Sequence, residues 1–453
     1  MPGAVRCSPA RSRELERAPL IHPSAGLVGE FYQLVLAATY HGDGLWGEAT
    51  FDLYPRALPP GWGYLVSAGL EPALAMLEQF SFTAAEVAAL AAMPAFARVP
   101  ASFFDALGRL RFEGDVFAIP EGTPVFPNEP VMRITAPVWV ATLLETRLLQ
   151  IVGTSISVAS RASRLVDAAA GRPVLEFGSR RSAGGESSTL ASRAAWIGGV
   201  AATTNAYATM ELGIPPFGTM SDTFLAAYGS DPLAYDAFRV HFPQLGHFAL
   251  PDDDPLDGVR RFAPFRDKVV LVRIDHDDLG PISRTVRAAL DEAGMKKTKI
   301  LGSGQLDEAA IERLVRLGAP IDHFAVGRAL AATVEPGIKM AFRIAEISRG
   351  TAPVPATRAG AARWPGRKQV IRLERHDFVC LESEAGAWSR TGWPLLQPVL
   401  RRGARLASPE LLTEARDRRS RMVGALPVGL RAPVATEHRE VRISDKLAAL
   451  ALA

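Results

Sequence analysis

The feature that most constrains the fold of this chain is a regular alternation of strand-like and helix-like runs between residues 173 and 326. Short apolar runs take turns with longer runs whose apolar residues recur at helical spacing. Such alternation is typical of parallel strands joined by helical crossovers. The runs cover residues 173–177, 189–212, 215–219, 223–228, 268–274, 282–293, 299–301, 306–317 and 323–326. The sequence therefore predicts an α/β domain, built as a β/α barrel or as an open, doubly wound sheet.

Polar or glycine residues stand at the ends of several of the strand-like runs. They are Gly178, Gly218, Asp275, Ser303 and Gly327. In a β/α barrel the reactive groups gather at the carboxyl ends of the strands, so we expect the functional site there. No G-x-G-x-x-G motif opens the first strand–helix unit, which argues against a dinucleotide-binding domain.

Two adjacent arginines, Arg180 and Arg181, follow the first of these strands and precede a Gly/Ser-rich turn and a helix-like run. A guanidinium fork fits the paired oxygens of a phosphate or a carboxylate. The helix N-terminus adds N–H donors that have no partner within the helix. A solvated surface loop is the simpler interpretation, but the combination favours an anion site.

An acidic cluster, Asp275-His276-Asp277-Asp278, closes a later strand. Carboxylates placed in this way can hold Mg²⁺, which commonly takes one or two of them together with substrate phosphates, or they can bind the two hydroxyls of a ribose. The alternative is a group of N-capping residues before the next helix. We favour a functional site because the cluster coincides with the other polar strand ends.

Two short glycine turns follow the next two strands, at Ser303-Gly304 and at Val326-Gly327-Arg328. Small residues allow backbone N–H groups to approach a phosphate closely. Either turn alone is weak evidence. Together with the arginine pair and the acidic cluster, they predict a site for a phosphorylated ribose.

The composition limits the classes of binding partner that this chain is expected to have. The 51 basic and 48 acidic residues nearly balance, which gives no argument for binding nucleic acid or a membrane surface. Cys7 and Cys380 form no metal-ligand spacing and imply no disulfide framework. The N-terminus has no apolar signal region, and the most apolar long segment, 136–159, contains Glu145 and Arg147. We therefore expect a buried helix at that segment and a cytoplasmic protein.

Several motifs, taken in order, resemble those of the nicotinate phosphoribosyltransferase family. The match covers about residues 29–427, and the number and order of the motifs make it specific. The motifs are E-F-Y-Q-L at 30–34, G-Y at 63–64, A-G-L-E at 68–71, P-E-G at 120–122, P-N-E-P at 127–130, E-F-G-S-R-R at 176–181, A-S-R-A-A at 191–195 and P-G-R-K-Q-V at 365–370.

The resemblance implies an irregular α/β barrel of the type II phosphoribosyltransferase kind, with a second α/β domain formed by the N- and C-terminal segments. The expected division is a flexible tail at 1–22, the second domain at 23–133 and 346–430, the barrel at 134–345, and a C-terminal tail at 431–453. The Pro-, Gly- and Arg-rich stretch 336–372 is expected to be a connecting loop.

The resemblance also implies an activity. The family makes nicotinate mononucleotide from nicotinate and phosphoribosyl pyrophosphate, with Mg²⁺ and coupled ATP hydrolysis. Its members are expected to be homodimers with the active site at the subunit interface. By this comparison Tyr32 stacks on the pyridine ring across that interface.

The remaining roles are likewise implied by the resemblance. Arg180 and Arg181 face the pyrophosphate and the nicotinate carboxylate, and Asp275 and Asp278 serve the ribose hydroxyls and the metal. The turns at Ser303-Gly304 and Val326-Gly327 hold the 5′-phosphate. Further substrate-binding positions are Gly178, Thr219, Thr223, His276 and Arg328.

The sequence departs from the family at the site itself. The family's phosphohistidine lies in a G-T-x-A-H-S run, and here Asp222 takes its place within residues 218–223. Without an imidazole nucleophile the coupling to ATP is in question; an aspartyl phosphate is chemically possible. His276 and Arg328 stand where the family has smaller side chains.

Three functions fit these residues. The first is phosphoribosyl transfer to nicotinate or a related pyridine acid, in NAD salvage. The second is an ATP-independent phosphoribosyltransferase for a different aromatic substrate, or an enzyme that cleaves a nucleoside phosphate, with Arg328 and His276 setting specificity. The third is a non-catalytic, nucleotide-binding paralogue; the retained arginine pair and the carboxylates of Asp275 and Asp278 argue against it.

Overall fold

The computed structural model describes residues 25–243, 245–250, 254–331, 337–350, 352–358, 363–388 and 390–452. Internal packing divides the chain into two units. The first unit contains the described residues from 161 to 331, and the second contains those from 25 to 160 and from 337 to 452. The expected N-terminal tail, 1–22, lies outside the described residues.

The first unit is built on a six-stranded sheet in the order β7-β6-β11-β10-β9-β8, and all of its pairings are parallel. Its strands are β6 (Val174–Glu176), β7 (Ala202–Thr203), β8 (His247–Ala249), β9 (Leu271–Asp275), β10 (Lys299–Ser303) and β11 (His323–Val326). The alternation in the sequence therefore correctly predicts a mixed α/β fold with a parallel sheet.

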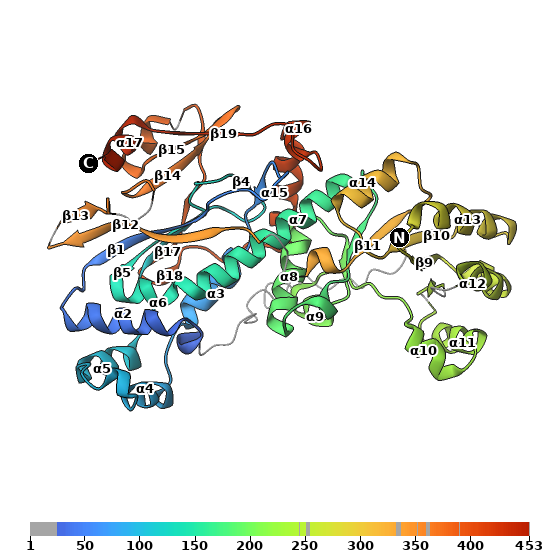
Figure 1. The fold of residues 1–453 in the computed structure, drawn as a ribbon, viewed down its shortest axis with the longest axis horizontal. Helices are drawn as coiled ribbons and strands as arrows, with labels where there is room; N and C mark the ends of the chain where they lie inside the picture. The colour runs from blue at the N-terminus through green and yellow to red at the C-terminus, as the bar shows by residue number, and fades with distance from the viewer. Residues whose placement is uncertain are drawn as a thin grey trace. The chain divides into compact units, whose positions relative to one another are not determined.

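Helices connect these strands, and the run from β9 through α13, β10 and α14 to β11 can be followed in Figure 1. The segments are η4 (Ser179–Arg181), α8 (Gly185–Ile197), α9 (Ala206–Leu212), α10 (Asp222–Tyr228), α11 (Asp231–His241), α12 (Pro255–Phe262), η5 (Ala263–Lys268), α13 (Leu279–Glu292), α14 (Glu308–Arg316) and η6 (Arg328–Leu330). A core on one face of the sheet contains Leu175, Ala202, Leu271, Leu301 and Ala325. Removal of these apolar side chains from water holds the strands in register.

Two details of the predicted alternation are wrong. The run 189–212, expected to be one helix, is broken by Gly198 and Gly199 and contains the short strand β7. The expected strand 215–219 is reduced to a single bridge between Pro216 and Thr203. Gly199 has a positive φ of 109°, which ends the helix.

The second unit contains a seven-stranded antiparallel sheet in the order β13-β12-β1-β5-β3-β17-β18, a four-stranded sheet in the order β16-β14-β15-β19, and the pair β2-β4. The strands are β1 (Glu48–Pro55), β2 (Leu65–Val66), β3 (Asp115–Ala118), β4 (Pro124–Val125), β5 (Met132–Pro137), β12 (Met340–Arg349), β13 (Ala352–Pro355), β14 (Lys368–Arg372), β15 (His376–Leu381), β16 (Trp393–Pro394), β17 (Gln397–Arg401), β18 (Ala404–Arg405) and β19 (Glu440–Ile443).

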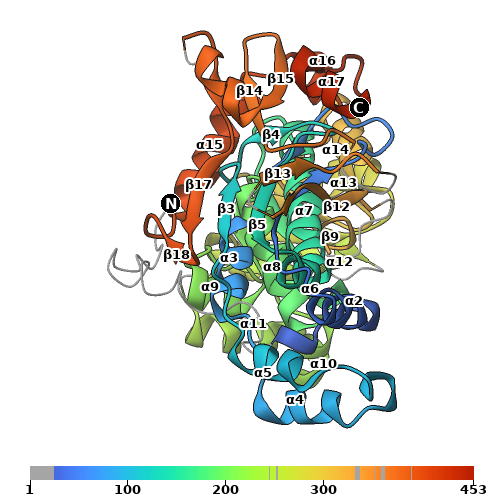
Figure 2. The same cartoon turned by 90° about the vertical axis from the view of Figure 1, so that its left-hand side faces the viewer.

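Helices of the second unit pack on these sheets, and α2 and α6 lie against each other in Figure 2. The helical segments are η1 (Ala25–Leu27), α2 (Phe31–Gly42), α3 (Leu70–Gln79), α4 (Ala84–Ala91), η2 (Pro94–Phe96), α5 (Ala101–Arg109), α6 (Val138–Leu148), η3 (Leu149–Gly153), η7 (Glu382–Trp388), α15 (Leu412–Gly424), α16 (Val428–Arg431) and α17 (Asp445–Leu452). Helix α7 (Thr154–Ala168) crosses from the second unit into the first.

The units differ from the ranges expected from sequence. Helix α6 contacts α2, β1 and β5, so the boundary falls after residue 160 and not at 134. Strand β12 pairs with β1 from Met340 to Ile347, so residues 340–349 of the expected loop are strand. Within the expected C-terminal tail, β19 pairs in parallel with β15. Helix packing decides the first difference, and backbone pairing with strands far away in the chain decides the other two.

No single helix among the described residues is long and apolar enough to cross a membrane. One bent pair, α3 with α4, reaches the required length and composition together, with 74° between the two helices.

Candidate active site

The parallel register brings the predicted strand ends together on one edge of the first unit's sheet. Ser303 of β10 lies opposite Asp275 of β9, and Val326 of β11 lies opposite Glu176 of β6. Glu176 in turn lies opposite Thr203 of β7. Because all of these residues end parallel strands, the turns that follow them share the carboxyl edge of the sheet.

The Glu176 carboxylate accepts several hydrogen bonds at this edge. It is 1% exposed and accepts hydrogen bonds from the backbone N–H of Gly178, from Ser192 Oγ at 2.9 Å and from Thr203 Oγ1 at 2.5 Å. Thr203 Oγ1 also accepts from the backbone N–H of Asn205 at 3.0 Å. One buried carboxylate thus joins β6, α8, β7 and the start of α9.

Arg180 and Arg181 lie in η4, directly after Gly178, and both side chains are exposed. The Arg181 backbone N–H donates to Gly178 O at 2.8 Å, which closes the turn. Among the residues that the structure describes, neither guanidinium forms an ion pair. Both charges are therefore available to an anion at the carboxyl edge.

Gly178 also allows two turns to approach each other. A Cβ atom at this position would lie 2.8 Å from Glu176 Oε1 and 3.1 Å from the carbonyl oxygen of Gly327. Gly327 caps η6, whose first residue, Arg328, is exposed. The arginine turn and the Val326-Gly327 turn are therefore neighbours.

The Asp275 carboxylate is held by two residues. Its Oδ2 accepts a hydrogen bond from Ser303 Oγ at 3.0 Å and lies 4.0 Å from a guanidinium nitrogen of Arg273. Arg273 also donates to Thr219 Oγ1 at 3.4 Å, and its Nε is buried without a partner among the described residues. Arg273 thus links Asp275 with the loop that contains Thr219.

The rest of the acidic cluster forms an exposed loop. The backbone N–H of Asp278 donates to Nδ1 of His276 at 2.9 Å, which folds the ring back onto its own loop. Gly304 has a φ of 142°, and a Cβ there would lie 2.8 Å from the carbonyl oxygen of His276. Only glycine fits this close approach between the two loops without strain.

Asp222 is the first residue of α10, after the N-cap Ser221, whose Oγ accepts from the Phe224 N–H at 3.2 Å. The position of the Asp222 carboxylate is outside what the structure describes. Thr223 is exposed on the same short helix. The segment that replaces the phosphohistidine run therefore begins a helix in the first unit.

Tyr32 belongs to the second unit, on α2. Its hydroxyl donates to Glu145 Oε2 at 3.4 Å, and its side chain is 47% exposed. Burial of the hydroxyl and the negative charge of Glu145 raise the pKa of Tyr32. Exposed apolar side chains surround it on and beside α2: Leu27, Val28, Phe31, Val35 and Leu36.

Sequence reasoning missed two residues of this site as chemical groups. Glu176 entered only as part of a motif, and Arg273 only as a strand residue. A charged residue inside an otherwise apolar strand, next to the polar strand end, is the signal that could have marked both.

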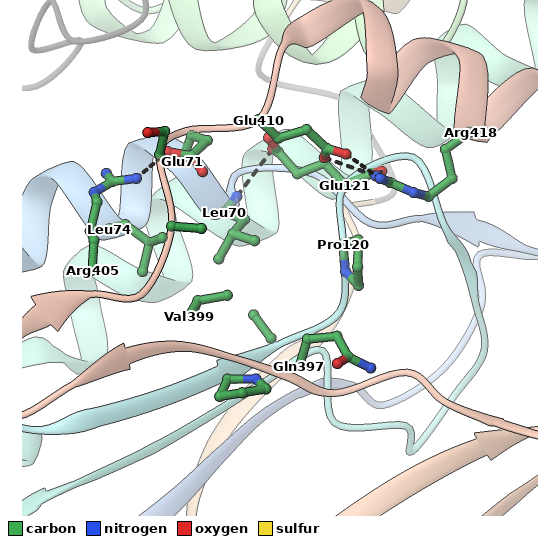
Figure 3. A pocket seen from close by; sticks show the side chains of 14 residues that line it. Leu70, Glu71, Leu74, Pro120, Glu121, Gln397, Val399, Arg405, Glu410 and Arg418 are labelled. Carbon is green, nitrogen blue, oxygen red and sulfur yellow. Dashed lines mark hydrogen bonds and ion pairs between the residues drawn. The ribbon is translucent and has the colours of Figure 1, made fainter. Parts of the chain in front are cut away.

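The second unit contains a separate cavity of about 200 Å³, shown in Figure 3. Arg405 pairs with Glu71 at 2.6 Å, and Arg418 donates to Glu410 at 2.9 Å. Glu121 Oε1 accepts from the backbone N–H of Leu70 at 3.1 Å. Each guanidinium is paired with a carboxylate, and Glu121 accepts from backbone N–H groups, so the cavity shows no unmet demand for a charged ligand.

A parallel α/β sheet with guanidiniums, carboxylates and glycine turns at its carboxyl edge is the arrangement of an enzyme that binds a phosphorylated substrate. Comparison with known proteins shows to which family within this class of enzymes the chain is similar. The family model for the nicotinate phosphoribosyltransferase N-terminal domain matches residues 27–153.

Relatives match nearly the whole chain. The nicotinate phosphoribosyltransferase pncB2 of Mycobacterium tuberculosis is 35% identical over 433 residues, which are 93% of this chain and 92% of that protein. The nicotinate phosphoribosyltransferase of Bacillus subtilis is 33% identical over 381 residues, 80% of this chain and 77% of its own. The chain belongs to the nicotinate phosphoribosyltransferase family.

Solved structures agree on the fold. Human nicotinic acid phosphoribosyltransferase matches with a TM-score of 0.77 at 23% identity, covering 94% of this chain and 99% of the human chain. Nicotinate-nucleotide pyrophosphorylase from Pyrococcus furiosus matches with a TM-score of 0.73 at 23% identity, with the same coverage.

Proposed function

We propose that this protein transfers the phosphoribosyl group of phosphoribosyl pyrophosphate to nicotinate or a related pyridine acid, with release of pyrophosphate. One observation carries the proposal: unpaired guanidiniums, carboxylates and glycine turns meet at one carboxyl edge. The names of the relatives at 33–35% identity support the same reaction. The proposal includes a place for this reaction in NAD salvage.

The reaction is a substitution at the anomeric carbon of the ribose. The bond to pyrophosphate breaks as the pyridine nitrogen forms its bond to that carbon, so positive charge develops on the sugar and negative charge on the leaving group. Arg180 and Arg181 are placed to stabilise the departing pyrophosphate or to bind the carboxylate of the pyridine acid. The pyridine nitrogen needs no general base, so positioning is the main task of the protein.

The ribose and its 5′-phosphate have matching partners on the same edge. Asp275, oriented by Ser303, and Asp278 can accept hydrogen bonds from the two ribose hydroxyls. Backbone N–H groups in the turns at Ser303-Gly304 and Val326-Gly327 suit the 5′-phosphate. In this assignment Gly178, Thr219 and Thr223 line the same region.

Asp275 and Asp278 also fit a bound Mg²⁺. Mg²⁺ is usually held by one or two carboxylates with phosphate oxygens and water as its other ligands. No group of three or more His, Cys, Asp or Glu side chains that could hold a metal alone exists in the described part of the chain. When bound, Mg²⁺ would neutralise charge on the leaving pyrophosphate.

The assembly is proposed to be a homodimer that completes each site. Exposed apolar side chains on α2, including Phe31, Val35 and Leu36, form a contiguous set of the kind that marks interaction surfaces. Tyr32 lies among them and would stack on the pyridine ring of the partner's site. The closure of the parallel sheet into an irregular barrel belongs to the same proposal.

Asp222 leads to the second part of the proposal, that synthesis proceeds without coupled ATP hydrolysis. A carboxylate at this position cannot act as the imidazole nucleophile that ATP phosphorylates in the family. An ATP-independent enzyme for a different aromatic acid is the alternative. The exposed side chains of His276 and Arg328 favour it, because both residues lie in turns at the carboxyl edge, where the substrate is proposed to bind.

The test measures nicotinate mononucleotide and pyrophosphate by mass spectrometry, with Mg²⁺, with and without ATP. We expect equal product with and without ATP for the wild type, and a loss of about a hundredfold or more for Arg181→Ala. No pyrophosphate release with nicotinate or any of a panel of pyridine acids would contradict the transferase. Stimulation of the wild type by ATP would contradict uncoupled synthesis, and Asp222→His shows whether an imidazole alone restores it.

A further inference from the structure

A second basic region lies at the opposite, amino edge of the first unit's sheet. A cavity of about 740 Å³, here called the amino-edge cavity, is lined by the segments that precede three neighbouring strands, β6, β11 and β10. These segments are 171–173, 319–322 and 296–299. Strand β10 runs from Lys299 in this cavity to Ser303 at the carboxyl edge, about 13 Å away for five residues. The cavity is therefore separate from the candidate active site.

Two of the cations in the cavity are already neutralised. Lys299 Nζ pairs with Asp322 Oδ1 at 2.8 Å, and Asp322 Oδ2 accepts from the Ile300 N–H at 2.9 Å. Arg287 pairs with Asp291 at 2.7 Å and donates to two backbone carbonyl oxygens of the segment that follows. These contacts shape the cavity, and they leave little of the positive charge of Lys299 and Arg287 available to a ligand.

Arg287 holds the loop that carries two further lysines. It donates to Met295 O at 2.9 Å and to Thr298 O at 2.7 Å, and the Thr298 N–H closes a turn onto Met295 O at 3.1 Å. Lys296 and Lys297 are the central residues of this turn and are exposed. The backbone beneath both ammonium groups is thus fixed before any ligand arrives.

Arg172 lines the cavity and is its third cation, after Lys296 and Lys297, that no carboxylate among the described residues neutralises. Its side chain is half-buried, and its NH1 atom is buried without a hydrogen-bond partner among the described residues. Gly171 beside it has a φ of 85°, and no atom lies within 4 Å of the position of a Cβ there.

We propose that the amino-edge cavity binds a small molecule with a chain of phosphates, such as inorganic tripolyphosphate or a nucleoside triphosphate. Three cations on a fixed frame, Arg172, Lys296 and Lys297, match the three to four negative charges of a triphosphate better than those of a single phosphate. The volume of the cavity lies within the range of nucleotide-sized ligands.

The experiment titrates the full chain by calorimetry with tripolyphosphate, ATP and orthophosphate. The background carries Arg180→Gln and Arg181→Gln, so that the carboxyl edge does not contribute. We expect tripolyphosphate to bind, and the added pair Lys296→Gln and Lys297→Gln to weaken it by about tenfold or more. Stronger binding of ATP would support a nucleotide as the ligand, and equal binding would support recognition of the phosphate chain alone.

Arg260→Gln is the matched control, because this exposed arginine on α12 does not line the cavity. It should leave the affinity unchanged. Hydrogen exchange should slow on ligand addition in peptides that contain Arg172 and the 295–298 turn. Binding that ignores the lysine substitutions, an equal loss for Arg260→Gln, or orthophosphate binding as tightly as tripolyphosphate would overturn the proposal.

Discussion

At the scale of single residues, the candidate site depends on a carboxylate that contacts no substrate in our assignment. Glu176 accepts from Gly178, Ser192 and Thr203, and all three donors are buried. A buried carboxylate is tolerated only when such donors satisfy it. Glu176 is therefore a positioning residue that fixes the start of the arginine turn.

Replacing Glu176 by glutamine tests this role, because the glutamine side chain has nearly the same shape as the glutamate side chain. The amide lacks the negative charge that strengthens these three hydrogen bonds, and its nitrogen can be accommodated only if the Ser192 and Thr203 hydroxyls rotate to accept from it. We therefore expect a loss of about 1–3 kcal/mol in the free energy of unfolding. Denaturant unfolding measures the loss, and KM for phosphoribosyl pyrophosphate should rise as the arginine turn loosens. Glu312→Gln, on the exposed face of α14, is the control. Equal unfolding midpoints for both variants would refute the role.

At the scale of elements, two strands begin with histidines whose burial has a consequence for stability. His247 opens β8, and its ring stacks on Phe217 with 4.7 Å between centroids. His323 opens β11, and its Nδ1 is buried without a partner among the described residues. Burial lowers the pKa of both imidazoles. The folded first unit therefore favours their neutral forms.

The lowered pKa values of the two histidines predict how the stability of the first unit depends on pH. Because the folded pKa values lie below those of the unfolded chain, the stabilisation is complete above about pH 6.5 and declines as the pH falls through the folded values. Hydrogen exchange in peptides covering β8 and β11 should quicken between pH 7 and pH 5 beyond the intrinsic effect of pH. The double variant His247→Gln and His323→Gln should flatten this dependence, whereas His438→Gln should not. An unchanged acid slope in the double variant would contradict the assignment.

At the scale of the whole molecule, the proposed dimer makes one site from two chains. Tyr32 lies in the second unit, whereas Arg181 and Asp275 lie in the first. If the partner supplies Tyr32, a mixed dimer of two differently damaged chains contains one intact site. The symmetry of the dimer thus gives a test that needs no interface geometry.

We expect Tyr32→Ala and Arg181→Ala to be nearly inactive alone and to regain about one quarter of wild-type activity when co-expressed, because half of the dimers are mixed and each has one intact site. The measurement is nicotinate mononucleotide formation per chain. Arg181→Ala with Asp275→Ala is the control and should regain nothing, because both residues belong to the same unit. No recovery in the first pair would contradict a shared site.

Local pattern alone was enough to predict much of this protein. Apolar runs with polar ends marked β6, β9, β10 and β11, because strand burial and helical spacing are written within short windows of sequence. The arginine pair, the acidic cluster and the glycine turns were visible for the same reason. Their meeting at one edge followed from the rule that parallel strands end together.

Only the tertiary structure decided which residues, far apart in the sequence, supply one another's hydrogen-bond partners. The three donors to Glu176 come from positions 178, 192 and 203, and the strand 340–349 exists because β1 pairs with it. The unpaired NH1 of Arg172 is likewise a property of its surroundings and not of its neighbours in the chain. Burial, and the demand for hydrogen-bond partners that burial creates, arises only when segments far apart in sequence are packed together.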